Sequence, residues 1–227
     1  MMKIGIVIPA YNEAVQLGEV LGQVKQHIGS DNICVVDDGS QDRTSDVATS
    51  AGVQCIRFPE NRGKGEALKT GFQWAVNQGL DAVITLDADG QHDPDLIPEF
   101  IETMKMKLCD VVLGTRPFRL GEMPPDRILS NTISSYFVSL AARQKIRDSQ
   151  SGYRMFKLSA LKGLPLRGQL YELESEMLIR LGRKHARFAT CAIPAYYEDA
   201  PSHIRRWRDI RRFVKMWLTV VFEREDS

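Results

Sequence analysis

The sequence predicts one α/β domain built on a mainly parallel sheet flanked by helices. Short apolar runs alternate with longer stretches of helical periodicity, the pattern of a parallel sheet with crossover helices. Acidic turns follow three of these runs, and ligands of such sheets bind at the carboxyl ends of the strands. The composition agrees, because 43% of the 227 residues are hydrophobic and 26% are charged, as in proteins that bury a sizeable core.

The predicted elements follow one another in a regular order. Each strand is a short apolar run bounded by turn residues such as Gly, Pro, Asp or Asn. Between them, apolar side chains recur every three or four residues, which predicts amphipathic helices. The predicted strands are 3–8, 33–36, 53–58, 82–86 and 111–116, with another after a polar turn in 148–156; the predicted helices are 15–28, 43–51, 65–78, 127–143 and 173–182.

Charge and cysteine usage argue against several classes of protein. Thirty basic and 29 acidic residues give a net charge of +1, so no global field attracts nucleic acid. Cys34, Cys55, Cys109 and Cys191 are far apart and have no histidine at ligand spacing, which argues against structural zinc and fits a reducing compartment. The chain enters a strand at Lys3 and has no apolar run of about 18 residues, so we expect a cytoplasmic protein without a signal peptide or spanning helix.

The acidic pair in Asp87-Ala88-Asp89 ends one of the apolar runs. Side chains at positions i and i+2 of an extended chain share one face, so the two carboxylates can converge. Oxygen-only ligands suit Mg²⁺ or Mn²⁺, which keep open positions for substrate phosphates. The pair therefore predicts a metal–diphosphate site. The alternative is an ordinary turn in which Asp93 caps the segment after Pro94.

Two further turns are candidates for nucleotide binding. The first strand ends in Pro9-Ala10-Tyr11-Asn12-Glu13 and not in Gly-x-Gly-x-x-Gly, which disfavours a dinucleotide Rossmann site. Asn61-Arg62-Gly63-Lys64-Gly65 lacks the Walker pattern, so it is either a cradle for phosphates or the base, or a flexible helix start. Asp37-Asp38 could accept from a base N–H or a ribose hydroxyl, while Ser40 or Asp42 caps the next helix.

Taken in order, these motifs resemble the family 2 glycosyltransferases of the Rossmann-like GT-A fold. Within that family they are most similar to the polyprenyl-phosphate (dolichyl-phosphate) mannose and glucose synthases. The resemblance implies a nucleotide-diphosphate sugar donor of the GDP-mannose or UDP-glucose type. The motifs that carry it are Ile8–Glu13, Val35–Ser40, Asn61–Gly65, Asp87–His92, Gly114-Thr115-Arg116, Arg127 with Asn131, and Asp148–Arg154.

The resemblance also implies a role for individual residues. The residues expected to line the nucleoside pocket are Pro9, Tyr11, Glu13, Val36 and Asp38, and Lys64 joins them beside the phosphates. The residues expected to hold Mg²⁺ or Mn²⁺ and the diphosphate are Asp87, Ala88, Asp89 and Gln91. The residues expected near the acceptor phosphate are Arg127, Asn131 and Arg205. Asn131 stands where these synthases often have serine. Near the C-terminus they often carry Ser-Lys, whereas this chain has Ser202-His203-Ile204-Arg205, in which Arg205 would supply the positive charge.

The implied reaction is an inverting transfer, with attack on the face opposite the leaving group. The metal and the guanidinium fork of Arg116 would stabilise the departing nucleoside diphosphate. The residues predicted to be catalytic are Asp89, Arg116, Arg127 and Asp148.

The acceptor decides whether a base is needed. A lipid monophosphate has a second pKa of about 6, so near neutral pH it needs only positioning by Arg127 and Arg205. A sugar hydroxyl needs a carboxylate base, for which Asp148 is the first candidate, with Glu172 and Glu174 behind it. Alternatively, Asp148 caps a turn, and the two glutamates form the acidic first turn of a helix, which the macrodipole favours.

Residues 203–227 are predicted to form a basic amphipathic helix appended to a domain of residues 1–202. Arginines and one lysine outnumber acids in 203–217, and apolar residues recur at helical spacing as far as Val221. The pattern predicts either contact of 203–221 with an anionic membrane surface on the cytoplasmic side, or packing on the domain with a solvated basic face. No nucleic-acid fold signature accompanies the charge, so no nucleic-acid partner is expected.

The resemblance and the motifs together predict an inverting, metal-dependent hexosyltransferase that acts on a polyprenyl (dolichyl or undecaprenyl) phosphate in cell-envelope glycan synthesis. Two alternatives stay open. One is a glycosyltransferase with a hydroxyl acceptor on a glycan or glycolipid. The other is a nucleotide-sugar-binding module without catalysis.

Overall fold

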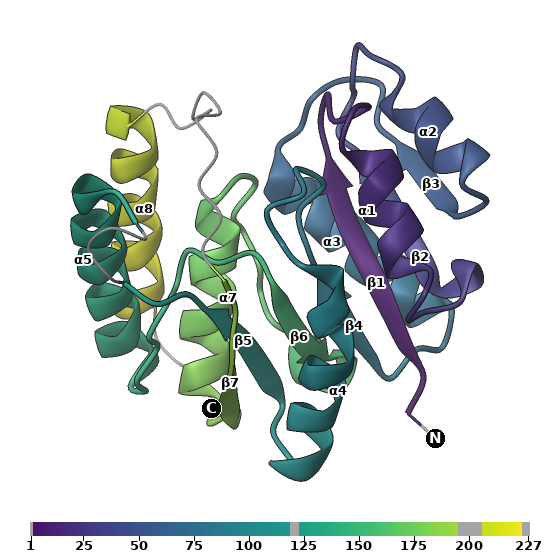
Figure 1. Cartoon of the computed structure of the whole chain (residues 1–227). Helices are drawn as coiled ribbons and strands as arrows, with labels where there is room; N and C mark the ends of the chain where they lie inside the picture. The colour runs from purple at the N-terminus through teal and green to yellow at the C-terminus, as the bar shows by residue number, and fades with distance from the viewer. Residues whose placement is uncertain (1, 119–122, 195–205, 224–227) are drawn as a thin grey trace.

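A seven-stranded sheet forms the centre of the molecule (Figure 1). The computed structural model describes residues 2–118, 123–194 and 206–223. The strand order is β3-β2-β1-β4-β6-β5-β7, and every neighbouring pair is parallel except the two that involve β6. The mainly parallel sheet expected from the sequence is therefore confirmed. The strands are β1 Ile4–Ala10, β2 Ile33–Asp37, β3 Gln54–Arg57, β4 Ala82–Thr85, β5 Val111–Thr115, β6 Arg154–Lys157 and β7 Phe188–Ala192.

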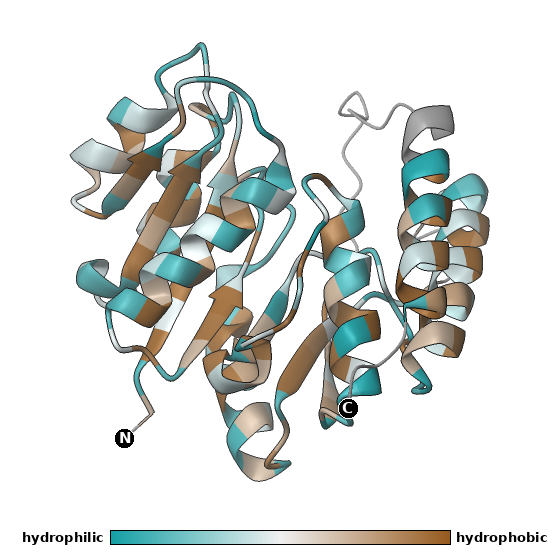
Figure 2. Ribbon diagram, turned by 180° about the vertical axis from the view of Figure 1, so that it is seen from behind, coloured by the Kyte–Doolittle hydropathy of each residue, from teal (hydrophilic) through white to brown (hydrophobic). Residues whose placement is uncertain are grey.

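Helices cover both faces of the sheet and form two hydrophobic cores with it. One core lies under α1, α2 and α4, and the other under α3 and α7, with α5 and α8 packed against α7. In Figure 2 the hydrophobic residues concentrate in the strands between these layers. The helices are α1 Leu17–Val24, α2 Thr44–Ser50, α3 Lys64–Asn77, α4 Ile97–Met106, α5 Pro125–Ala142, α6 Leu158–Leu161, α7 Glu172–Arg183 and α8 Arg206–Phe222, with 3₁₀ turns η1 Ser30–Asn32 and η2 Pro94–Leu96.

The β1 strand shows why continuous apolar runs form the central strands. All seven of its residues are buried, because successive side chains point to opposite faces and both faces are covered. Ile6 and Ile8 enter the core under α1, whereas Val7 enters the core under α3. Gly71 lets α3 approach closely, since a Cβ atom there would lie 2.2 Å from Cγ1 of Val7.

The antiparallel β6 strand determines where the site is built. It lies between β4 and β5, so it begins at the edge of the sheet where both neighbours end. The loop that precedes it, 148–153, is thereby brought to the carboxyl ends of the parallel strands. Thr85 anchors this loop, because its Oγ1 donates to the carbonyl oxygen of Gly152 at 2.8 Å.

The basic C-terminal segment is helical in its described part and packs on the domain. Met216 and Val220 of α8 are buried in the core that includes α7. Arg183 of α7 donates to the carbonyl oxygens of Val220 and Val221, near the end of α8. No helix in the described ranges is long and apolar enough to cross a membrane. The expected boundary between residues 202 and 203 lies outside the described residues.

Candidate active site

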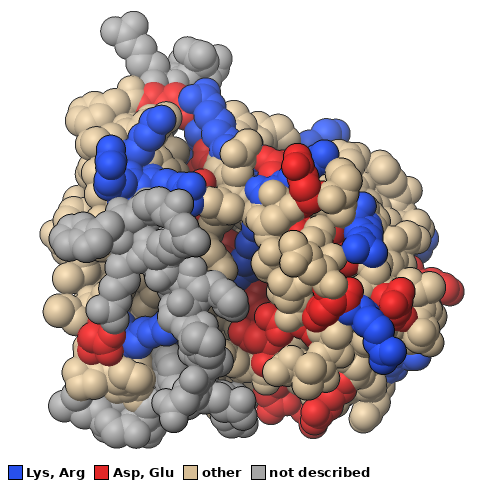
Figure 3. Space-filling model, turned by 90° about the horizontal axis from the view of Figure 1, so that it is seen from above, with Lys and Arg blue, Asp and Glu red and all other residues tan. Residues whose placement is uncertain are grey.

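The three acidic turns expected at the carboxyl ends of strands meet at one edge of the sheet. The segment Tyr11–Glu13 follows β1, Asp37 ends β2, and Asp87–Asp89 follows β4. The strand order places β2, β1 and β4 side by side, so these turns are neighbours in space. Figure 3 looks onto this edge and shows acidic side chains gathered beside basic ones near the middle of the face.

Glu13, Asp87 and Asp89 form an electrostatically crowded group of carboxylates. Burial, together with repulsion from Asp89, Asp87 and Asp42, raises the pKa of Glu13 to about 7. Burial and the neighbouring Asp87 also raise the pKa of Asp89 above its ordinary value. The site therefore carries more negative charge than its own residues neutralise, and a cation is favoured there.

The donor set fits Mg²⁺ or Mn²⁺ held jointly by protein and substrate. The described residues contain no cluster of three or more His, Cys, Asp or Glu side chains that could enclose a metal. Asp87 and Asp89 offer oxygen ligands, and octahedral Mg²⁺ is commonly bound by one or two carboxylates plus substrate phosphates. Gln91 lies on the same turn, where its backbone N–H donates to Asp89 Oδ1 at 3.0 Å.

Lys64 supplies the positive charge inside this group. Its Nζ lies 2.6 Å from Asp87 Oδ1 and 3.2 Å from Glu174 Oε2, and 5.9 Å from the centre of the Tyr171 ring. Burial tends to lower the pKa of Lys64, but the two carboxylates outweigh it and hold the pKa above its ordinary value. For Asp87, burial tends to raise the pKa, but the neighbouring positive charges, Lys64 first among them, outweigh this effect and lower the pKa below its ordinary value.

The glycine-rich turn before α3 is shaped by packing as well as by its position beside the site. A Cβ atom at Gly65 would lie 2.5 Å from the backbone carbon of Gln169, so α3 begins in direct contact with the chain that leads into α7. Gly63 has φ of 96°, which only glycine adopts readily. The helix-start alternative therefore describes the glycines, and Lys64 lies among the carboxylates of the site; that this turn cradles phosphates or the base stays a prediction.

Asp38 holds this turn in place. Its two carboxylate oxygens accept from the backbone N–H groups of Arg62 at 2.7 Å and Gly63 at 2.8 Å. Desolvation nonetheless raises its pKa above the ordinary value. Asp42 makes the expected turn at the start of α2, since its Oδ1 accepts from the backbone N–H of Thr44 at 3.0 Å. Asp38 is thus a structural link between the ends of β2 and α3, whatever it binds.

The expected nucleoside pocket combines buried and exposed residues. Pro9 and Val36 lie at the carboxyl ends of their strands and Ala88 follows β4, but all three are buried. A ligand at this edge would therefore meet their backbone and not their side chains. Tyr11 is 38% exposed, and a half-exposed ring beside this edge can stack on a base. Within the predicted pocket, Tyr11 and Glu13 have the more accessible side chains.

Arg116 and Asp148 form a two-pronged ion pair at the same edge. Arg116 Nε lies 2.8 Å from Asp148 Oδ2, and Nη2 lies 3.0 Å from Oδ1. The fully buried carboxylate also accepts from the backbone N–H groups of Arg116, Gln150 and Ser151. Asp148 thus accepts five hydrogen bonds, which fix the direction of the Arg116 guanidinium and the shape of the turn. This geometry favours the alternative in which Asp148 caps a turn over the one in which it acts as a base.

Glu172 and Glu174 are engaged as well. Glu172 is the first residue of α7 and reaches back to the N–H groups of Gln169 and Leu170. Glu174 is buried and paired with Lys64. Both glutamates lie in the acidic first turn of α7, as the alternative from the sequence predicted, and Glu174 in addition belongs to the Lys64 cluster.

Two of the predicted acceptor residues lie on the first turns of α5. Arg127 is half-buried. Asn131 is buried and its Nδ2 contacts Met123 Sδ at 3.9 Å, while its Oδ1 has no hydrogen-bond partner among the residues that the structure describes. Arg205 lies outside the described residues.

Sequence reasoning assigned no role to the residues that support the acidic turn. His92 Nδ1 accepts from the backbone N–H of Asp87 at 3.0 Å, and burial lowers the pKa of the imidazole to about 4, so His92 is neutral. The Tyr153 ring lies 5.2 Å from the His92 ring and stacks on Phe100 at 4.3 Å. Asp93 caps η2, as the alternative reading of this turn predicted for that residue.

Arg154 is a second supporting residue without a predicted role. It is fully buried beneath the site and donates to the carbonyl oxygens of Ser149, Ser151 and Glu174 at 2.7–2.9 Å. Desolvation lowers its pKa, against the effect of the surrounding carboxylates. The signal in the sequence was an arginine directly before the apolar pair Met155-Phe156.

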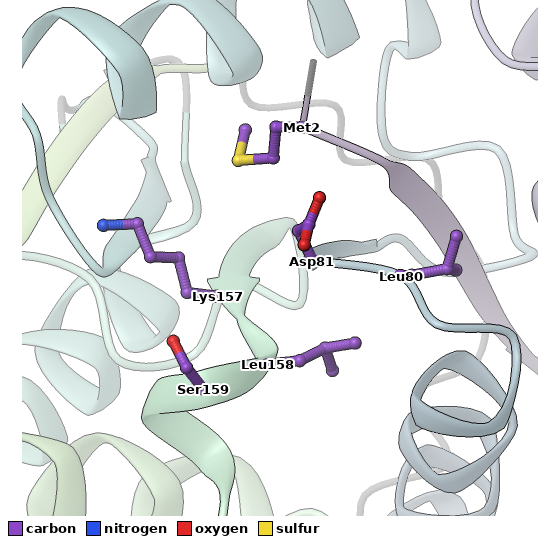
Figure 4. A pocket seen from close by; sticks show the side chains of 6 residues that line it. All are labelled: Met2, Leu80, Asp81, Lys157, Leu158 and Ser159. Atoms are coloured by element: carbon purple, nitrogen blue, oxygen red, sulfur yellow. The ribbon is translucent and has the colours of Figure 1, made fainter.

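A hollow at the opposite edge of the sheet has a different character (Figure 4). It has a volume of about 500 Å³ and is lined by Met2, Leu80, Asp81, Lys157, Leu158 and Ser159. Its charged groups are already satisfied, since Asp81 accepts from the backbone of Lys3 and Lys157 pairs with Asp110. We therefore place the active site at the carboxyl edge.

Fold and site together define a glycosyltransferase with a GT-A-like α/β fold, and comparisons with known proteins agree. The chain belongs to glycosyl transferase family 2, whose model matches residues 5–164. The UDP-N-acetylglucosamine–dolichyl-phosphate N-acetylglucosaminyltransferase of Methanococcus voltae is 33% identical over 86% of this chain and 86% of its own length. The undecaprenyl-phosphate mannosyltransferase of Micrococcus luteus is 28% identical over 85% of this chain and 83% of its own.

Solved structures show the same fold. Glucosyl-3-phosphoglycerate synthase of Mycobacterium tuberculosis matches with a TM-score of 0.74 at 20% identity, over 99% of this chain and 82% of that one. Another structure of that enzyme contains Mn²⁺, UDP and phosphoglyceric acid, and matches with a TM-score of 0.75 at 18% identity, over 99% and 80% of the two chains.

Proposed function

We propose that this protein is an inverting, metal-dependent glycosyltransferase that moves a hexose from a nucleotide-diphosphate sugar to a polyprenyl phosphate. The observation that carries the proposal is that each carboxylate considered as a base is already engaged. Asp148 accepts five hydrogen bonds, Glu172 accepts from the backbone, and Glu174 pairs with Lys64. A phosphate acceptor needs no base, whereas a hydroxyl acceptor does.

On the donor side, the residues of the acidic edge would hold a nucleoside diphosphate. Asp87 and Asp89 would bind Mg²⁺ or Mn²⁺, which when bound acts as a Lewis acid on the leaving diphosphate. Arg116, aimed by Asp148, can grip phosphate oxygens with its guanidinium fork. The Mn²⁺ and UDP in the mycobacterial structure support this assignment by similarity of fold.

On the acceptor side, Arg127 and Arg205 would position the lipid phosphate. One phosphate oxygen forms a bond to the anomeric carbon as the bond from that carbon to the donor phosphate oxygen breaks on the opposite face. The electron pair leaves with the nucleoside diphosphate, the configuration inverts and no proton is transferred. The relatives named for dolichyl- and undecaprenyl-phosphate acceptors support this choice.

Sugar transfer in detergent tests the proposal. The purified chain is incubated with Mn²⁺, radiolabelled GDP-mannose, UDP-glucose or UDP-N-acetylglucosamine, and undecaprenyl or dolichyl phosphate. We expect label in the organic phase with one donor, and a loss of at least about a hundredfold in Asp89→Asn, because the metal clamp is gone. Asp95→Asn is the matched control, since Asp95 is exposed and pairs with His27 on the surface. Label in hydroxyl acceptors alone would overturn the proposal.

A further inference from the structure

The surface formed by α5 and α8 exposes large apolar side chains in a regular pattern. On α5 these are Leu129, Ile133, Tyr136 and Leu140, and on α8 they are Ile210, Val214, Leu218 and Phe222; all are 44–77% exposed. The spacing of three or four residues places each set on one face of its helix. We call the two sets together the α5/α8 face.

The two helices lie side by side, so the two stripes form one surface (Figure 1). Trp217 of α8 donates its Nε1–H to the carbonyl oxygen of Phe137 of α5 at 2.8 Å. The two rings meet edge to face with centroids 5.8 Å apart. This contact joins the helices, while the buried sides of both face α7. The exposed apolar residues are therefore not left over from poor packing, because each helix already has a buried side of its own.

Positive charge borders the apolar stripe. Arg211 and Lys215 are exposed and directly follow Ile210 and Val214, so each projects about 100° around the helix from the apolar residue before it, at the edge of the stripe. α8 contains five basic residues and one acidic residue, whereas the whole chain has a net charge of only +1. Basic residues that follow α5, namely Arg143, Lys145 and Arg147, are also exposed.

We propose that the α5/α8 face docks on an anionic lipid bilayer, with its apolar stripe inserted at the headgroup boundary and its basic border against the lipid phosphates. Apolar burial combined with attraction to anionic lipid is what binds such helices to membranes. A two-fold contact with a second copy fits the pattern less well, because the same cations of both copies would approach one another at its rim.

The role of this docking rests on the proposed function. The first turn of α5 carries Arg127, the predicted contact with the acceptor phosphate, so docking would bring that contact close to the lipid surface. The lipid tail of the acceptor would stay in the bilayer while its phosphate reaches the carboxyl edge of the sheet. The sequence predicted membrane contact through residues 203–221 alone. The structure adds α5, which contacts α8 through Phe137 and Trp217 and carries an exposed apolar stripe of its own.

Vesicle binding without any substrate tests the proposal. The full chain is co-sedimented with vesicles of phosphatidylcholine containing 30% phosphatidylglycerol, and with vesicles of phosphatidylcholine alone. We expect binding to the anionic vesicles and at least tenfold less binding to the neutral ones. Tyr136→Glu and Val214→Glu should each lower the partition coefficient about tenfold, because each loses apolar burial and gains repulsion. Lys215→Gln should lower it about fivefold on anionic vesicles only.

Met106→Glu is the matched control, because Met106 is 77% exposed but lies on α4, away from this face. It should bind like the wild type, and circular dichroism confirms that each variant is folded. Equal binding by the wild type, Tyr136→Glu and Val214→Glu would overturn the proposal. So would a dimer that these substitutions dissociate in the absence of vesicle binding, as measured by light scattering. A failed transfer assay with intact vesicle binding would instead refute the proposed acceptor.

Discussion

Lys64 is the counterion of the acidic edge, and Lys64→Met tests how much of the site depends on it. The substitution keeps an unbranched side chain in the same space but leaves Asp87 and Glu174 without their shared cation. Removing one partner of a buried pair costs about 3–5 kcal/mol. The three side chains are 11–27% exposed, so solvent relieves part of this cost, and we expect a loss of about 2–3 kcal/mol in the free energy of unfolding.

For a chain of this size, that loss lowers the melting temperature by about 5–10 °C. Differential scanning fluorimetry in metal-free buffer measures it. The variant should also bind Mn²⁺ more tightly than the wild type in the absence of nucleotide, because Lys64 no longer competes for Asp87. Electron paramagnetic resonance of free Mn²⁺ measures that affinity, and bound Mn²⁺ should restore part of the melting temperature by mass action.

Lys69→Met is the matched control. Lys69 lies on the same helix and pairs with Glu66 at 2.6 Å, but this is an i,i+3 pair away from the acidic edge. Such helix-surface pairs contribute about 0.5 kcal/mol or less. If Lys64→Met and Lys69→Met lower the melting temperature equally, and neither changes the affinity for Mn²⁺, then Lys64 is not the counterion of this site.

Three other substitutions probe separate parts of the structure. Gly182→Ala should destabilise the fold by about 1–3 kcal/mol, since its Cβ would lie 2.4 Å from the carbonyl oxygen of Ala142 where α7 meets α5, and chemical denaturation measures this. In the wild type, the pKa of His92 is about 4 in the folded chain, so the unfolded chain binds the proton first as the pH falls from 6.5 to 4. This lowers the free energy of unfolding by up to about 3 kcal/mol, and His92→Asn should remove that pH dependence. Asp148→Asn should lower kcat about a hundredfold without shifting the pH profile, because Arg116 loses its orientation while no proton transfer is lost.

Each of these predictions has a result that contradicts it. Unchanged denaturation of Gly182→Ala would mean that α5 and α7 separate at no cost. The contribution of His92 is read as the difference between the stability curves of the wild type and His92→Asn. Glu13, whose pKa is raised, stabilises both proteins as the pH falls, and its contribution cancels in that difference. Parallel stability curves would reject the buried neutral histidine. Loss of the acidic limb of the rate profile in Asp148→Asn would restore Asp148 as the base.

Strand positions were readable from the sequence where burial on both faces demanded an unbroken apolar run. The five parallel strands from β1 to β5 were predicted within one or two residues at most ends, whereas β7 was not, because Phe188–Ala192 is half-buried and lacks such a run. α4 was also not predicted. Its two prolines, Pro94 and Pro98, look like turn residues, yet they occupy the first turns of η2 and α4, where proline is tolerated.

For the charged residues, the sequence predicted where they lie but not which partners they have. Asp87 and Asp89 could be assigned to one face of an extended chain by the period of two, and the alternation of strands and helices implied that three acidic turns would meet. The sequence does not show which carboxylates are already satisfied. Asp148 was the first candidate base and Glu174 one of those behind it, and only their contacts with Arg116 and Lys64 argue otherwise.

By itself, the sequence determined the α/β class, and it predicted the carboxyl edge as the place of the site and the Asp87–Asp89 pair as its metal ligands, because these follow from local periodicity. The tertiary structure decided what depends on contacts between distant segments. It paired Lys64 with Glu174, which are far apart in the chain, and turned β6 antiparallel so that the Asp148 loop reached the site. It also joined α5 to α8, which turned two separate amphipathic helices into one continuous surface.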